Sequence, residues 1–167
     1  MKAGVNPRAH APEGGPGASR RFVAGGDFGT GTREQELVGN AMGSVCEQLG
    51  GCEFAIGLGD NIYDENPQSP YEEAFEQKFE YPMRHANFPF YMALGNHDNS
   101  LVVDGIGNWN RTGEVQVESS HRTDRVTDRW IMPSRYYQHS PPENSGAPTP
   151  TFVVLDPTPF MTVSDTA

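Results

Sequence analysis

Three short apolar segments of the chain each end in a glycine that is followed by a polar side chain. The segments cover residues 20–25, 54–58 and 88–94, and the polar residues that follow them are Asp27, Asp60 and Asn96. Asp27 and Asp60 lie 33 residues apart, and Asp60 and Asn96 lie 36 apart, close to the ~30 residues of one strand–helix–strand unit. This spacing predicts parallel strands joined by right-handed helical crossovers, and therefore an α/β fold.

Two helices are expected between these strands. The first covers residues 32–49 and ends at a pair of glycines. Its apolar residues recur at helical spacing on one face: Leu37, Val38, Ala41, Met42, Val45 and Leu49. The second helix begins at Ser69, runs toward Pro82, and has Glu72 in place to complete a capping box.

The remainder of the chain predicts shorter elements. Residues 99–120 are polar and irregular in pattern, and a short helix is expected over residues 121–129. Strands are expected over residues 135–138 and 151–156, with a loop rich in proline, serine and glycine between them.

A chain of 167 residues fits a single domain. Residues 1–19 contain glycine, proline and alanine without an apolar period, which predicts a flexible tail ahead of a domain over residues 20–167. We find no N-terminal apolar segment of the kind that forms a signal peptide. No apolar run approaches the ~20 residues that span a bilayer, so no membrane insertion is expected.

Charge and cysteine content narrow the classes of partner and compartment. A formal net charge of −10 argues against a general nucleic-acid binder and against a polybasic membrane-surface module.

Cys46 and Cys52 are too few for a disulfide framework and do not form a CxxC metal site. Their spacing permits a local disulfide in an oxidising compartment, and two small buried apolar side chains are an equally good alternative.

The polar residues at the strand ends form a candidate metal site. Ligands in open α/β sheets gather at the carboxyl ends of the strands, so Asp27, Asp60 and Asn96 are expected to face one crevice, together with Tyr63. For any one of these residues alone, a structural role is the better explanation: a turn at Asp60 and Asn61, or a left-handed backbone position at Asn96. Two carboxylates, an amide oxygen and a phenol in one pocket would repel one another or stay unsatisfied without a cation. Hard oxygen ligands suit Mg, Mn, Zn or Fe, and a tyrosinate favours ferric iron.

Residues 26–29, 59–63 and 95–98 read Gly-Asp-Phe-Gly, Gly-Asp-Asn-Ile-Tyr and Gly-Asn-His-Asp. In this order they resemble the first three signature blocks of the calcineurin-like metallophosphoesterases. Tyr63, three residues after the second aspartate, is similar to the mark of the purple (tartrate-resistant) acid phosphatase branch. The segment from Arg129 to Tyr137 also resembles that branch. The resemblance covers about residues 22–156.

The resemblance implies the N-terminal part of an αββα sandwich, with a mostly parallel sheet and flanking helices. It implies a hydrolase of small phosphate monoesters that uses two metal ions to activate water, Fe³⁺ with Fe²⁺, Zn²⁺ or Mn²⁺. The roles that it implies are these: Asp27 and Tyr63 bind the first metal, Asp60 bridges both, Asn96 binds the second, His97 contacts phosphate or protonates the leaving alkoxide, and Asp98 orients the His97 ring.

The chain departs from the family in its histidines. The family also uses histidine ligands from later Gly-His and Gly-His-x-His blocks, and none of the five histidines of this chain lies in such a block. We therefore expect an incomplete domain that is weakly active alone and is completed by a C-terminal segment. The alternative is a non-catalytic metal-binding fragment or interaction module. The resemblance favours a secreted or periplasmic protein, whereas the missing signal peptide favours a cytoplasmic one.

Overall fold

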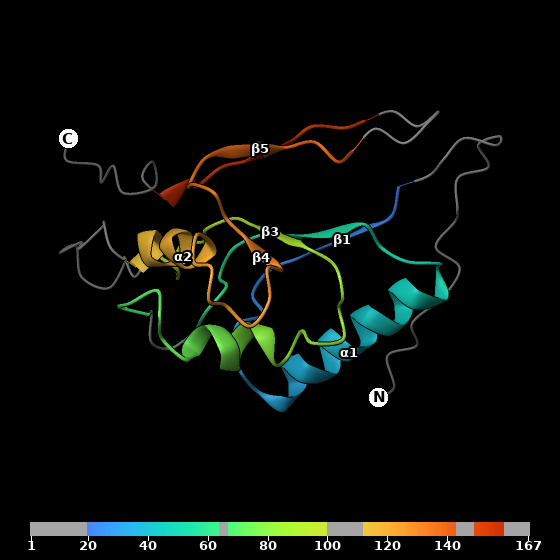
Figure 1. Cartoon of the computed structure of the whole chain (residues 1–167), viewed down its shortest axis with the longest axis horizontal. Coiled ribbons are helices and arrows are strands. Elements are labelled where there is room, and N and C mark those ends of the chain that lie inside the picture. The colour runs from blue at the N-terminus through green and yellow to red at the C-terminus, as the bar shows by residue number, and fades with distance from the viewer. Residues whose placement is uncertain (1–19, 64–66, 100–111, 143–148, 159–167) are drawn as a thin grey trace, which may run out of the picture.

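The computed structural model describes residues 20–63, 67–99, 112–142 and 149–158 (Figure 1). The flexible tail expected over residues 1–19 lies outside this range. Within the described part of the chain, no helix is both long enough and apolar enough to cross a membrane.

A four-stranded parallel sheet forms the centre of the molecule. Its strands are β1 (Phe22–Gly25), β2 (Phe54–Gly57), β3 (Phe90–Met92) and β4 (Trp130–Ile131), which lie side by side in that order. All three pairings are parallel, as the alternation of strands and helices predicted. Strand β4 was not predicted, because two residues carry no readable periodicity.

Helix α1 (Arg33–Gln48) begins where it was expected, at Thr32, whose side chain accepts a hydrogen bond from the Gln35 N–H. The face that contacts the protein is not the one with most of the large apolar residues. Gly39 and Gly43 lie directly against the backbone of Pro82 and His85. Four apolar side chains of the predicted face point to solvent instead: Leu37, Val38, Val45 and Leu49.

The second crossover is less regular than expected. The Ser69 N–H donates to the Glu72 carboxylate at 2.9 Å, so one of the two capping-box bonds is present. The chain then makes turns and becomes helical only at residues 74–80, including the π-helical η1 (Glu76–Glu80). Phe75 and Phe79 of this segment pack edge-on against Trp130 in the core.

The prediction of a helix over residues 121–129 is wrong. The helix here is α2 (Thr112–Ser120), and the residues after it form bends. Arg122 and Arg125 stabilise these bends by donating to the carbonyl oxygens of Pro70 and Trp130. Helix α2 carries no apolar stripe because polar residues, such as Gln116, are buried alongside its valines.

A second sheet covers one face of the first. It consists of β5 (Tyr137–His139) and β6 (Phe152–Val154), which pair antiparallel. Figure 1 shows this sheet on the side opposite α1. Aromatic rings join the two sheets: Phe54 contacts His139 and Phe152, and the His139 ring stacks on Tyr91 at 3.5 Å. The architecture is therefore α/β, with a parallel sheet between helices and a second sheet.

The two cysteines form a disulfide. The sulfur atoms of Cys46 and Cys52 are bonded, which decides between the two alternatives that the sequence left open. The bond joins the last turns of α1 to the segment that leads into β2.

Candidate metal centre

The loops that follow β1, β2 and β3 meet at one edge of the sheet. Asp27, Asp60 and Asn96 all line an open cavity of about 440 Å³ there. Asp27 and Asp60 have left-handed backbone conformations, with φ of 57° and 55°. Such conformations are costly for residues other than glycine and cluster at functional sites, so their presence at two neighbouring strand ends marks this edge.

The Tyr63 hydroxyl group lies between the two aspartates. Its oxygen lies 2.7 Å from Asp27 Oδ1 and 3.0 Å from Asp60 Oδ2, so the two carboxylates share its single proton. Burial raises the pKa of the Tyr63 phenol, as do its hydrogen bonds to both carboxylates and their negative charges. The phenol proton therefore offsets the charge of two carboxylates at the point where their oxygen atoms converge.

Asp60 also contacts the third loop. Its second oxygen, Oδ1, accepts a hydrogen bond from the His97 N–H at 3.0 Å, and the His97 ring lies 5.2 Å from the Tyr63 ring. This approach requires glycine at position 95, because a Cβ atom there would lie 2.2 Å from Asp60 Oδ1. The side chains of Asn96, which lines the cavity, and of His97 are exposed.

The Asp98 carboxylate is fully buried behind the site. Its oxygen atoms accept hydrogen bonds from the backbone N–H groups of Gly95 and Asn61 and from the side chains of Asn61 and Gln116. Burial raises the pKa of Asp98, and these hydrogen bonds act in the opposite direction. Asp98 therefore holds together the two loops that carry Asp60 and Asn96.

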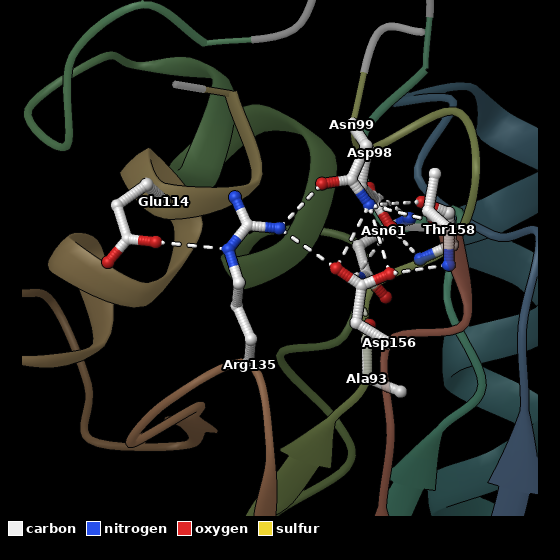
Figure 2. Close-up of polar contacts among 9 residues, drawn as sticks. Asn61, Ala93, Asp98, Asn99, Glu114, Arg135, Asp156 and Thr158 are labelled. Carbon is white, nitrogen blue, oxygen red and sulfur yellow. Dashed lines mark hydrogen bonds and ion pairs between the residues drawn. The ribbon is translucent and has the colours of Figure 1, made fainter. Parts of the chain in front are cut away.

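A second layer of polar residues was not predicted from the sequence. Arg135 Nη1 donates to Asn99 Oδ1 at 2.7 Å and to Asp156 Oδ2 at 2.8 Å (Figure 2). The Asn99 amide in turn donates to the Gly95 carbonyl oxygen at 3.0 Å. These residues lie far apart in the sequence, so no local pattern links them. Asp156 directly follows the apolar run of residues 152–155, and that position could have drawn attention to it.

The residues present fit a hard cation in part. Two carboxylates and a phenol converge, and the Asn96 side chain shares their cavity; these are oxygen donors of the kind that Mg, Mn, Zn or Fe accept. Among the described residues, no three histidine, cysteine, aspartate or glutamate side chains gather closely enough to hold a metal ion. The donors that converge here, as far as the structure describes the chain, are oxygen atoms.

Comparison with known proteins gives a consistent result. The model of the calcineurin-like phosphoesterase family matches residues 36–155. Purple acid phosphatase 4 of Arabidopsis thaliana is 32% identical over 125 residues, which are 73% of this chain and 32% of that protein. Tartrate-resistant acid phosphatase type 5 of Oryctolagus cuniculus is 32% identical over 127 residues, which are 71% of this chain and 34% of that protein.

A solved structure shares the fold. GAP50, described as the anchor in the inner membrane complex of Plasmodium, superposes with a TM-score of 0.66 at 20% sequence identity. The superposition covers 88% of this chain and 44% of that one. The chain spans about a third of the length of the two acid phosphatases named above.

Proposed function

The chain belongs to the calcineurin-like phosphoesterase family, and from this premise we propose that it is the N-terminal part of a metal-dependent hydrolase of phosphate monoesters, of the acid phosphatase type. One observation carries the proposal. One carboxylate oxygen of Asp27 and one of Asp60, from two different strand ends, lie 2.7 Å and 3.0 Å from the Tyr63 hydroxyl oxygen.

The oxygen donors divide between two positions. Asp27 and Tyr63 would hold the first metal ion and Asn96 the second, with Asp60 shared. The two oxygens of Asp60 already face different loops, one toward Tyr63 and the other toward His97. Tyr63 would give up its proton on binding a metal ion, and as a phenolate it would favour Fe³⁺ at the first position, with Fe²⁺, Zn²⁺ or Mn²⁺ at the second. When bound, such a pair supplies an activated water and neutralises phosphate charge.

His97 completes the chemistry as a general acid. Its side chain is exposed next to Asn96, which lines the cavity, so we expect a small phosphorylated substrate to reach it. A ring nitrogen of His97 would give its proton to the alkoxide oxygen that leaves phosphorus, a contribution of roughly 10²–10⁴-fold in rate. We propose that Asp98 orients the His97 ring; its carboxylate accepts a hydrogen bond from the Gly95 N–H of the same loop.

We propose that the chain alone is only weakly active. Oxygen donors without nitrogen ligands bind transition metals less tightly and less selectively. We propose that a C-terminal segment completes the centre. Three apolar residues that line the cavity, Leu58, Val153 and Leu155, are about 60% exposed and favour such a covering segment. The same exposed residues support the second candidate, an interaction module without catalysis.

The disulfide supports a secreted or periplasmic location. Disulfides form and persist in oxidising compartments and are rare in the cytosol, and Cys46 and Cys52 are bonded here.

The test is Asp60→Asn with Asp128→Asn as the matched control, since the Asp128 side chain is 97% exposed. Titration with Mn²⁺ and hydrolysis of p-nitrophenyl phosphate are measured on both. We expect Asp60→Asn to abolish both signals and Asp128→Asn to preserve them. Mn²⁺ binding without hydrolysis in the unmodified chain would favour the non-catalytic module, and robust hydrolysis would refute the need for a completing segment.

A further inference from the structure

Two of the loops at the metal centre are joined by one buried carboxylate. Asp98 Oδ1 accepts the backbone N–H groups of Asn61 at 2.8 Å and of Ile62 at 3.3 Å. Asp98 Oδ2 accepts the N–H of Gly95 at 2.8 Å. The loop after β2 and the loop after β3 therefore share a single anion.

Helix α2 contributes one side chain to this junction, Gln116, which is fully buried. Its Nε2 donates to Asp98 Oδ1 at 2.8 Å, and its Oε1 accepts from Asn61 Nδ2 at 3.2 Å. A buried amide is costly unless both of its ends are paired, and here one end meets each loop. Gln116 belongs to helix α2 and to neither loop, and its side chain thus bridges the two loops.

The bridge acts on the neighbours of the candidate metal ligands. Asn61 directly follows Asp60, and Asp98 follows Asn96 by two residues. His97 lies between Asn96 and Asp98 in the sequence, and its backbone N–H donates to Asp60 Oδ1 at 3.0 Å. A misplacement of about 1 Å at such a point can reduce a rate about a hundredfold, so a group that fixes both loops controls the site without touching it.

We propose that Gln116 is a positioning residue, which acts through Asp98 and Asn61 to hold the loop with Asn96 and His97 against Asp60. The link between this bridge and catalysis rests on the proposed function. The bridge itself is a property of the folded chain and is measurable without metal.

The test compares Gln116→Met, which keeps the side-chain length and removes both hydrogen bonds, with Val117→Ala. Val117 is the next residue of α2 and packs in the core, so its truncation destabilises the helix without touching the bridge. Gln116→Leu is the second variant, since it removes the donor toward Asp98 and the acceptor toward Asn61 and adds no charge. Amide hydrogen exchange by NMR is measured on the metal-free chain, followed by Mn²⁺ titration.

We expect the His97 and Gly95 amides to exchange at least about tenfold faster in both Gln116 variants than in Val117→Ala, as for loss of a hydrogen bond to a charged group. Mn²⁺ affinity should fall by about the same factor. Equal exchange in all three variants overturns the inference. If the unmodified chain binds no Mn²⁺, the proposed metal-dependent function is contradicted. The exchange rates of the metal-free chain still decide whether Gln116 holds the two loops together.

Discussion

At the scale of single residues, the candidate site depends on backbone conformations that few residue types tolerate. Asp27 and Asp60 adopt left-handed φ values, and short polar side chains are among the few that do so at moderate cost. Gly95 makes room for Asp60 in the neighbouring loop. The residue types at these strand ends are therefore constrained by the fold as well as by ligand chemistry.

Gly95→Ala tests this constraint. The added Cβ would lie 2.2 Å from Asp60 Oδ1, so the loops must separate. We expect the free energy of unfolding to fall by about 1–3 kcal/mol, together with the affinity for Mn²⁺. Urea denaturation and metal titration measure the two effects. Gly25→Ala is the control because nothing lies within 4 Å of a Cβ there, and equal losses in both variants would contradict the steric argument.

At the scale of elements, the end of β6 is tied to the site by a buried ion pair. The Asp156 side chain is fully buried, and Arg135 lies 2.8 Å away with 19% of its side chain exposed. Asn99 connects this pair to the loop after β3, as Figure 2 shows. The second sheet and the metal loops therefore do not move independently.

Arg135→Met leaves the Asp156 carboxylate buried without its cation. Removing one partner of a buried pair is strongly destabilising, so we expect a loss of about 3 kcal/mol in the free energy of unfolding. Chemical denaturation measures it. Arg84→Met serves as the control, because the pair between Arg84 and Glu36 lies at the surface and should matter little. A similar result for the two variants would show that the Asp156 pair contributes nothing.

The aromatic contact between the two sheets makes stability depend on pH. Burial lowers the pKa of His139, whose Nε2 atom is buried without a hydrogen-bond partner among the described residues. Because the folded chain binds this proton more weakly than the unfolded chain, stability is lost as the pH falls below the unfolded value of 6.5. Denaturation at pH 8 and pH 5 should show a smaller difference for His139→Phe than for the unmodified chain; an equal difference would exclude His139 as the cause.

At the scale of the whole molecule, the disulfide constrains a short loop between α1 and β2. Cys46 and Cys52 are six residues apart, and closing so short a loop contributes about 2 kcal/mol by restricting the unfolded chain. Dithiothreitol should lower the melting temperature of the unmodified chain. It should leave that of the Cys46→Ser, Cys52→Ser double variant unchanged. A reductant effect on both would point to a cause other than this bond.

The sequence alone predicted the features that depend on the order of residues within short segments of the chain. Apolar runs that end in Gly-Asp or Gly-Asn predicted the first three parallel strands and the edge at which Asp27, Asp60 and Asn96 meet. These predictions succeed because strand direction and alternation fix where the carboxyl ends lie, whatever packs around them. The metal-binding roles of these residues stay predictions.

Tertiary structure decided which faces and which polar groups are buried. The apolar stripe of α1 marked a helix correctly, but the glycine face packs more closely against residues 82–85, so most of the stripe, Met42 excepted, stays exposed. Helix α2 escaped prediction because its buried glutamine resembles a surface residue until Asp98 and Asn61 are beside it. Burial of a polar group is favourable only when distant partners satisfy it, and that condition is met only in the folded chain.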